Sequence, residues 1–328
     1  MLSRIEQLLG EHGYRRRMTP RSFVIDTDTA SDDAVALLLA LTDKSASVRA
    51  VTIVAGNVPI DLAVKNALAT MALVEGAESV PTFVGLADPL IRRLETAQDV
   101  HGPDGMGGAA LPEPKSSVER THAVDALRQI ANEEPGMHEL ITLGPLSNIA
   151  AALILDPLLL TKFRRTTMML GAPDGIGNVS TLGEFNAWAD PEAAAIVLAA
   201  PGLKTMVGWN ISRRFAVVDP SLRNLIQSAG PLGAFTVEIN VDVDHYARIE
   251  SGLAGFDLPD PIAVAIALDP SIATVTTFEF VGVSSDAATR GQTYVDRRHT
   301  APPANCTIVW EADEQAFQRR LLAMAAHV

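Results

Sequence analysis

Residues 22–41 read SFVIDTDTASDDAVALLLAL, and this stretch decides the fold class. Its first part, Ser22 to Ile25, is a short β-prone run, and Asp32 to Leu41 follows as a run of Ala, Val and Leu whose first turn carries two carboxylates. Acidic side chains stabilise the N-terminal end of a helix through its dipole. The stretch therefore predicts a β-strand that leads directly into an α-helix.

The same order of strand, loop and helix recurs along the chain. A second apolar run, Val48 to Val54, ends at Ala55-Gly56-Asn57 and precedes a helical pattern from Leu62 to Val74. Consecutive units of this kind favour a parallel sheet. Further strands are expected at 140–143 and 167–170, and further helices at 191–199 and 260–268. The predicted fold class is α/β: a doubly wound, mostly parallel central sheet with helices on both faces and a Rossmann-like core.

The chain has 328 residues, of which 48% are hydrophobic, so disorder as the main state is excluded. No repeat or linker divides it, and we expect an N-terminal extension over 1–21 and a single catalytic domain over 22–328. In the extension, Leu2, Ile5, Leu8 and Leu9 stand at helical spacing before Arg15, Arg16 and Arg17. Glu6 and Glu11 interrupt the basic character, which favours a surface or subunit-contact helix over a transit peptide.

Charge and cysteine content narrow the function classes. With 26 basic and 39 acidic residues the formal net charge is −13, the wrong sign for a general nucleic-acid or anionic-membrane binder. Cys306 is the only cysteine, which excludes an intrachain disulfide and a thiolate metal site and fits a cytoplasmic location. No run approaches the roughly 20 apolar residues of a membrane helix.

The turn DTDTASDD at 26–33 carries four aspartates in eight residues: Asp26, Asp28, Asp32 and Asp33. Helix N-capping explains one or two of them. Four carboxylates this close repel one another, and they stand at the end of a strand, where open α/β sheets bind ligands. A divalent cation accounts for them better, and an all-oxygen ligand set favours Ca²⁺ or Mg²⁺ over zinc or copper.

The same segment, DTDTASDDAVALLLAL, resembles the N-terminal signature of the inosine–uridine-preferring nucleoside hydrolase family. Further segments resemble the family in the same order, over roughly residues 22–318: VTIVAGNV at 51–58, HGPDGMGG at 101–108, LGPLSNIA at 143–150 and GNVSTLGEFNAWADPEAA at 177–194. The resemblance implies hydrolysis of the N-glycosidic bond of ribonucleosides to free base and ribose, a homodimer or homotetramer, and a role in nucleoside salvage.

The resemblance also implies a Ca²⁺ ion at the bottom of the pocket. By motif position, Asp28 and Asp33 would be its N-terminal ligands, Leu143 would give its backbone carbonyl, and Asp260 would complete the set. Asp32 matches the general base, because a carboxylate beside a metal-activated water can take its proton. Asp26 is expected to hydrogen-bond within the turn and to orient the ligands.

Polar residues further along match the family's ribose-binding positions. By resemblance these are Asn57, Asn178, Glu184 and Asn186, and Glu184 and Asn186 would project to one side if their stretch is extended. Amides and carboxylates suit the hydroxyl groups of ribose and the positive charge of an oxocarbenium-like transition state. Met169 resembles a position that packs against the sugar, and a core methionine explains it equally well.

The chain departs from the family motif at Pro259. The family commonly has a His-Asp pair there, whose histidine is the proposed proton donor to the leaving base, and proline can donate nothing. His245 and Tyr246, in a helical stretch before a loop expected to be mobile at 251–258, are the candidate replacements, with a surface helix as the alternative. His101 is expected to be structural, and neither Trp188 nor Trp209 can be assigned to base stacking rather than to packing.

Two alternatives to a nucleoside hydrolase remain open on the sequence alone. The first is a catalytically silent ribose- or nucleoside-binding protein that kept the metal ligands and lost the acid at position 259. The second is a phosphohydrolase with an aspartyl-phosphate intermediate, because FVIDTDT resembles a DxDxT nucleophile motif. The second fits poorly, since Ala30 stands where the motif expects threonine.

Overall fold

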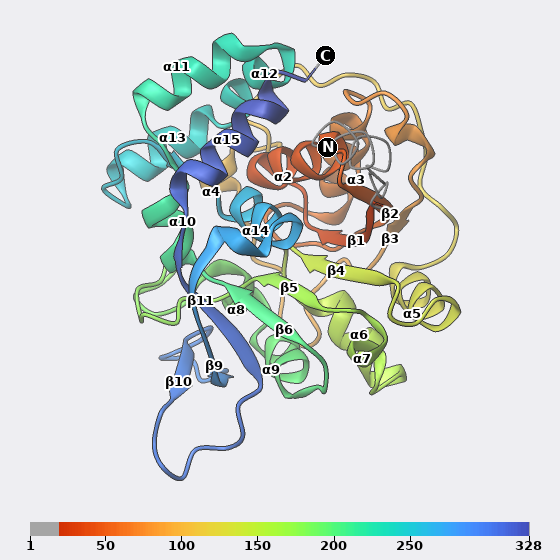
Figure 1. The fold of residues 1–328 in the computed structure, drawn as a ribbon, viewed down its shortest axis with the longest axis vertical. Coiled ribbons are helices and arrows are strands. Elements are labelled where there is room, and N and C mark those ends of the chain that lie inside the picture. Colours follow the sequence, from red (N-terminus) through yellow and green to blue (C-terminus); the bar gives the residue numbers. More distant parts are fainter. Residues whose placement is uncertain (1–19, 328) are drawn as a thin grey trace, which may run out of the picture.

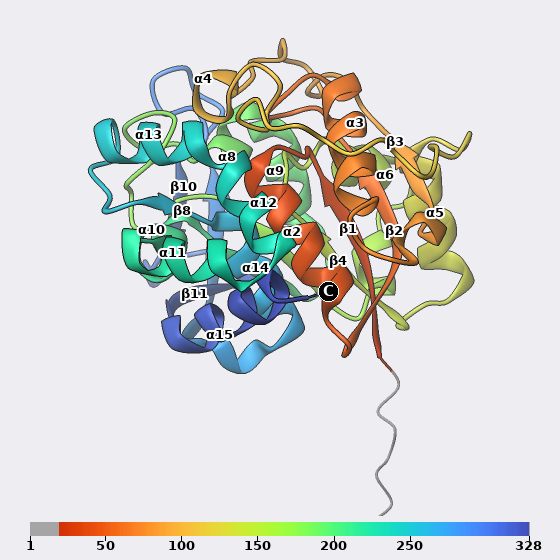
Figure 2. The ribbon, with the colours of Figure 1, turned by 90° about the horizontal axis from the view of Figure 1, so that it is seen from above.

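A computed structural model describes residues 20–327 (Figures 1 and 2). The helix expected within residues 2–17 lies outside the described residues. The centre of the fold is a sheet with strand order β10-β9-β11-β6-β5-β4-β1-β2-β3. Its strands are β1 (Arg21–Thr27), β2 (Ala46–Ile53), β3 (Thr82–Val84), β4 (His138–Thr142), β5 (Thr166–Met169), β6 (Lys204–Val207), β9 (Ala273–Val283), β10 (Thr293–Asp296) and β11 (Cys306–Ala312).

The sheet is mostly parallel, as predicted. From β3 to β11 every neighbouring pair runs parallel, and only β9 is antiparallel to its neighbours β10 and β11. The four strands expected from the sequence are present as β1, β2, β4 and β5, each within three residues of its expected ends. The antiparallel edge was not predicted. A second, two-stranded sheet joins β7 (Val217–Val218) to β8 (Phe256–Asp257).

Helices cover both faces of the central sheet (Figure 1). In chain order they are α2 (Ser31–Thr42), α3 (Ile60–Met71), α4 (Gln98–His101), α5 (Ala123–Glu133), α6 (Ser147–Leu155), α7 (Leu159–Lys162), α8 (Phe185–Ala189), α9 (Pro191–Ala199), α10 (Trp209–Phe215), α11 (Pro220–Ala229), α12 (Pro231–Ile239), α13 (Val241–Ile249), α14 (Pro259–Leu268) and α15 (Glu314–Ala325). Short 3-10 helices span Ala77–Ser79 and Pro270–Ile272. None of the helices within residues 20–327 is long and apolar enough to cross a membrane.

Strand alternation divides the core into two clusters. Because successive side chains of a strand point to opposite faces, Phe23 and Ile25 of β1 pack on one face and Val24 packs on the other. The first face is covered by α2 and α14, and the second by α6 and α9 (Figure 1). Helix α14, which reads PDPIAVAIAL, is apolar on all sides and is buried except at Pro259. Its packing against α2 brings residues near 30 and near 260 together.

The loop expected at 251–258 ends in a strand. Phe256 and Asp257 form β8 and pair with Val218 and Val217, and the prediction of a loop is wrong for these two residues. The physical reason is burial: Phe256 is 1% exposed and joins the core that α11 and α14 share. The helical stretch expected around residues 245 and 246 is confirmed as α13.

Candidate active site

A cavity of about 360 Å³ opens at the carboxyl ends of the parallel strands. This is the place where open α/β sheets bind their ligands. Most of the residues singled out from the sequence border it. They are Asp32, Asn57, Leu143, Met169, Asn178, Glu184, Asn186, Tyr246 and Asp260.

Three buried carboxylates meet at one wall of this cavity. One oxygen each of Asp32, Asp33 and Asp260 lies within 4.8 Å of the other two. Asp33 is oriented by Thr27 Oγ1, which donates to its Oδ1 at 2.6 Å, and by the amide of Ala30, which donates to Oδ2 at 3.0 Å. The second bond is a helix-capping contact, so the capping interpretation explains part of the role of Asp33. It does not explain the approach of Asp260.

Asp28 lies beside this group, fully buried, as the residue that follows β1 by one position. Its Oδ2 accepts a hydrogen bond from the amide of Asn57 at 2.6 Å, and its Oδ1 accepts none. Glycines make room for it: a Cβ at Gly56 would lie 2.1 Å from Asp28 Oδ2, and a Cβ at Gly144 would lie 2.6 Å from Asp28 Oδ1. The loops that contain Gly56 and Gly144 thus approach this carboxylate so closely that neither position has room for a Cβ.

Burial raises the pKa of every carboxyl in the group, and the charge of at least one neighbouring carboxylate adds to the effect for each. Burial raises the pKa of Asp32 and of Asp33 to about 6, and the charge of Asp32 adds to the effect on Asp33. For Asp28 and Asp260, burial and then the charge of Asp33 raise the pKa well above its usual range. The folded chain holds these carboxylates together at a cost in free energy.

This set of groups fits a hard divalent cation. All the donors are oxygens, and Oδ1 of Asp28 and Oδ1 of Asp32 are buried without a hydrogen-bond partner. Among residues 20–327 the only basic side chain within 4 Å of the four carboxylates is His101, whose Nδ1 lies 3.8 Å from Asp32 Oδ1. Because burial lowers the pKa of His101 to about 4, its imidazole is neutral at pH 7 and does not balance their charge.

The side chain of Asp26 bonds to other elements, so the expectation that it hydrogen-bonds within the acidic turn is wrong. It is fully buried on β1, and its Oδ1 accepts hydrogen bonds from Thr52 Oγ1 and, at 2.9 Å, from Asn148 Nδ2. Burial raises its pKa to about 7. These bonds tie β1 to β2 and to the start of α6 beneath the carboxylate group.

Glu184 and Asn186 reach the cavity from the start of a helix, so the condition for their projection to one side, an extended stretch, is not met. Glu184 is the N-cap of α8, and its side chain accepts from the amides of Asn186 and Ala187. The unpaired amides of a helix start explain why the chain turns helical there. Asn186 Nδ2 donates to the backbone oxygens of Leu143 and Met169.

Asn178 and Met169 complete this side of the cavity. Asn178 Oδ1 accepts from the amide of Phe185 at 2.9 Å and so holds the loop before α8. Met169 ends β5, is 3% exposed, and belongs both to the core and to the cavity lining. The core explanation for Met169 is therefore confirmed, and its packing against the sugar stays a prediction.

The two candidate proton donors on α13, His245 and Tyr246, differ in their relation to the cavity. Tyr246 borders the cavity, whereas His245 borders a neighbouring hollow together with Asp242 and Glu250. Tyr246 also borders this neighbouring hollow, whereas His245 does not border the cavity.

Three further aromatic or imidazole side chains border the cavity: His101, which was expected to be only structural, and two tryptophans. His101 is buried at the end of α4 and its Nδ1 lies 2.9 Å from Ser31 Oγ. Trp188 and Trp209 also line the cavity, from α8 and α10. The glycine-rich loop around His101 was the available signal for its position.

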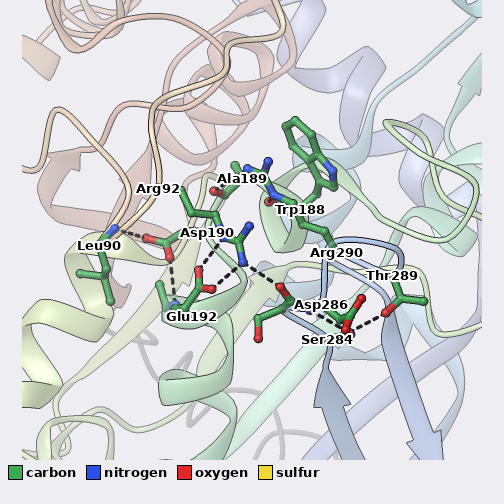
Figure 3. A network of polar contacts seen from close by, with 12 residues as sticks. Leu90, Arg92, Trp188, Ala189, Asp190, Glu192, Ser284, Asp286, Thr289 and Arg290 are labelled. Atoms are coloured by element: carbon green, nitrogen blue, oxygen red, sulfur yellow. Dashed lines mark hydrogen bonds and ion pairs between the residues drawn. The ribbon is translucent and has the colours of Figure 1, made fainter.

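An arginine network outside the cavity holds the wall that contains Trp188 (Figure 3). The guanidinium of Arg290 lies 3.7 Å from the centroid of the Trp188 ring and donates to Trp188 O at 2.7 Å and to Glu95 Oε1 at 2.6 Å. Nearby, Arg92 makes a bidentate pair with Glu192 and donates to Ser285 O. The segment between β9 and β10 is thereby fixed to α8 and α9.

Comparison with known proteins identifies the family. The model of the inosine-uridine preferring nucleoside hydrolases matches residues 23–319. A protein named pyrimidine-specific ribonucleoside hydrolase RihA, from Shewanella sp. (strain ANA-3), is 33% identical over 300 residues, which cover 90% of this chain and 93% of the relative. A protein of Schizosaccharomyces pombe without an assigned function, C1683.06c, is 33% identical over 304 residues, 91% of this chain and 97% of the relative.

Solved structures agree in fold. A purine-preferring ribonucleoside hydrolase from Gardnerella vaginalis superposes with a TM-score of 0.86 at 26% identity, over 93% of this chain and 99% of that structure. The plant nucleoside hydrolase PpNRh1 gives a TM-score of 0.87 at 29% identity, over 94% and 100%.

The chain belongs to the nucleoside hydrolase family and is an enzyme of that family. The match to the family covers nearly the whole chain. It favours a nucleoside hydrolase over both alternatives that the sequence left open, the silent binding protein and the aspartyl-phosphate phosphohydrolase.

Proposed function

We propose that this chain is a Ca²⁺-dependent hydrolase that cleaves the N-glycosidic bond of ribonucleosides to free base and ribose. The observation that carries the proposal is the meeting of Asp32, Asp33 and Asp260 at the wall of a cavity that is also lined by amide side chains. The similar proteins are named for different base preferences. The proposal therefore concerns the ribose and the N-glycosidic bond and leaves the base open.

Asp28, Asp33, Asp260 and the backbone oxygen of Leu143 would hold the cation. The unpartnered Oδ1 of Asp28 supports its place in this set. Leu143 O already accepts from Asn186 Nδ2, and a carbonyl oxygen has a second lone pair for a further partner. When bound, a divalent cation supplies positive charge that offsets the carboxylates and lowers the pKa of a water molecule held beside it.

Asp32 is the general base in this proposal. Its Oδ1 accepts no hydrogen bond and the residue borders the cavity, so it can receive the proton of the attacking water. The water oxygen bonds to C1′ of the ribose as the bond from C1′ to the base nitrogen breaks. The electron pair of that bond leaves with the base.

The remaining polar side chains position the sugar. Asn57, Asn178, Glu184 and Asn186 border the cavity, and amide and carboxylate groups match the donors and acceptors of ribose hydroxyls. Negative charge around the sugar stabilises positive charge that develops at C1′ in the transition state.

Release of ribose from a panel of ribonucleosides tests the proposal. The native protein with Ca²⁺ is expected to release ribose, and a chelator is expected to stop it. Asp32→Asn keeps the shape of the side chain and is expected to lower kcat by about 10²–10⁴-fold, the usual effect of removing a general base. Asp61→Asn, on the exposed start of α3, is the matched control. Full activity of Asp32→Asn, or activity unaffected by chelation, contradicts the mechanism.

The homodimer or homotetramer and the cytoplasmic location stay predictions. Cys306 is a buried free thiol whose pKa is raised by burial to about 12, and a thiol of this kind is compatible with a reducing compartment. Light scattering of the purified protein tests the oligomeric state.

A further inference from the structure

Asp257 is a buried carboxylate that the proposed mechanism does not use. It is the last residue of β8, is 8% exposed, and borders the same cavity as Asp32 and Asp260. The pairing of Val217 with Asp257 fixes its backbone.

Two donors on α10 hold the Asp257 carboxylate in one orientation. Trp209 Nε1 donates to its Oδ2 at 3.0 Å, and Ser212 Oγ donates to the same oxygen at 2.8 Å. Neither donor reaches Oδ1. The side chain is therefore held at Oδ2, and no donor among residues 20–327 bonds to Oδ1.

No arginine or lysine of residues 20–327 forms an ion pair with Asp257; every ion pair of the described chain involves other carboxylates. A buried carboxylate with spare acceptor capacity costs free energy unless a ligand uses it. Burial raises the pKa of Asp257, and the hydrogen bonds from Ser212 and Trp209 oppose this effect. In its ionised form the carboxylate accepts hydrogen bonds and donates none.

Helix α13 packs against β8, and Trp209 bonds to the Asp257 carboxylate. The cavity lining that comes from these neighbours includes Trp209, Val243, Tyr246 and Ala247. Such a lining suits a flat heterocycle, and a single fixed acceptor within it gives orientation and specificity. Pro259, which stands in place of the usual histidine, follows Asp257 by two residues.

We propose that Asp257 determines base specificity by accepting a hydrogen bond from a ring N–H of the leaving base. Inosine carries such a hydrogen at N1 and uridine carries one at N3. This inference rests on the proposed function for the identity of the ligand, and its test does not need turnover.

The test is a binding cycle in an Asp32→Asn background, with Ca²⁺ present. Calorimetry measures the affinity of inosine against 1-methylinosine and of uridine against 3-methyluridine, for Asp32→Asn alone and combined with Asp257→Asn. Asparagine can keep its oxygen towards Trp209 and Ser212, which then turns its NH₂ group to the cavity. Asp99→Asn, at the exposed rim of the cavity, is the matched control for loss of a charge.

In at least one pair, Asp257→Asn is expected to weaken binding of the unmethylated nucleoside by about tenfold or more and that of the methylated one by less than about twofold. Asp99→Asn should not separate the two. Equal weakening of both members of each pair would assign Asp257 to sugar binding or to folding and would overturn the inference. The inference would also be overturned if Asp257→Asn weakened neither member, or if Asp32→Asn alone bound neither nucleoside. Failure of the proposed function is recognised by a different result: the native protein would then not cleave p-nitrophenyl riboside, whatever the binding cycle shows.

Discussion

At the scale of single residues, the site depends on how closely backbone and carboxylates approach one another. Gly56 and Gly144 leave no space for a Cβ beside Asp28, although neither has a positive φ. Their role is therefore close approach rather than an unusual backbone conformation.

Gly56→Ala is expected to displace the Asp28 carboxylate, because the new Cβ would lie 2.1 Å from Oδ2 and 2.6 Å from Cδ of Pro145. We expect Ca²⁺ affinity to fall by about tenfold or more, measured by calorimetry on chelator-treated protein. Gly136→Ala is the control: it has φ +78° and no atom within 4 Å of the added Cβ, so it introduces backbone strain alone. Equal Ca²⁺ affinity of the two variants would contradict this role of Gly56.

The sequence predicted the residues of the site better than their local geometry. The acidic turn and Asp260 carry chemistry in their residue types, and the structure brings Asp32, Asp33 and Asp260 together. The positions of His101, His245 and Asp257 depend on how loops and α13 pack, which no local pattern encodes. Asp257 lies on a strand of two residues, too short to give a periodic signal.

At the scale of secondary-structure elements, the apolar patterns of β1, β2, β4 and β5 and of α2 and α14 were sufficient to predict the parallel sheet. The antiparallel strands β9 and β10 were not predicted. Strand β9 is largely exposed or half-buried along its length, so it lacks the continuous apolar run of the central strands. Its functional importance lies in the segment that leads to β10 and reaches α8.

Arg290→Ala is expected to loosen α8, because the guanidinium stacks on Trp188 and bonds to two successive backbone oxygens, Trp188 O and Ala189 O. Loss of these contacts should lower the free energy of unfolding by about 1–3 kcal/mol and raise KM more than it lowers kcat, since α8 carries Asn186. Denaturant unfolding and steady-state kinetics measure both.

Arg298→Ala is the matched control for Arg290, because Arg298 follows β10 and pairs with Asp296 at the surface, with 78% of its side chain exposed. Exposed pairs contribute little, and we expect its stability and KM to stay close to those of the native protein. Similar KM values for the two variants would contradict the role of Arg290.

At the scale of the whole molecule, the carboxylate group joins two helices that lie far apart in the sequence. Asp32 and Asp33 begin α2, whereas Asp260 lies in the first turn of α14, and these two helices pack side by side (Figure 1). Without a cation, their like charges oppose this packing. A cation that binds only the folded state shifts the folding equilibrium towards it.

Saturating Ca²⁺ is therefore expected to raise Tm, with a gain of about 2.7 kcal/mol when the ion is at 100 times its Kd. Asp260→Asn removes one of the repelling charges and one proposed ligand. The chelator-treated variant should be at least as stable as the chelator-treated native protein, and the rise in Tm with Ca²⁺ should be largely lost. A rise equal to that of the native protein would show that the ion binds elsewhere.

The measurement that tests the central claim most directly is the rate of chromophore release from p-nitrophenyl β-D-ribofuranoside by chelator-treated protein as Ca²⁺ is added back. This leaving group departs without a proton donor, so Pro259 cannot obscure the result. We predict turnover that rises with Ca²⁺ and saturates in the native protein and is nearly absent in Asp32→Asn. A rate that does not depend on Ca²⁺, or that is the same in Asp32→Asn, would contradict the account.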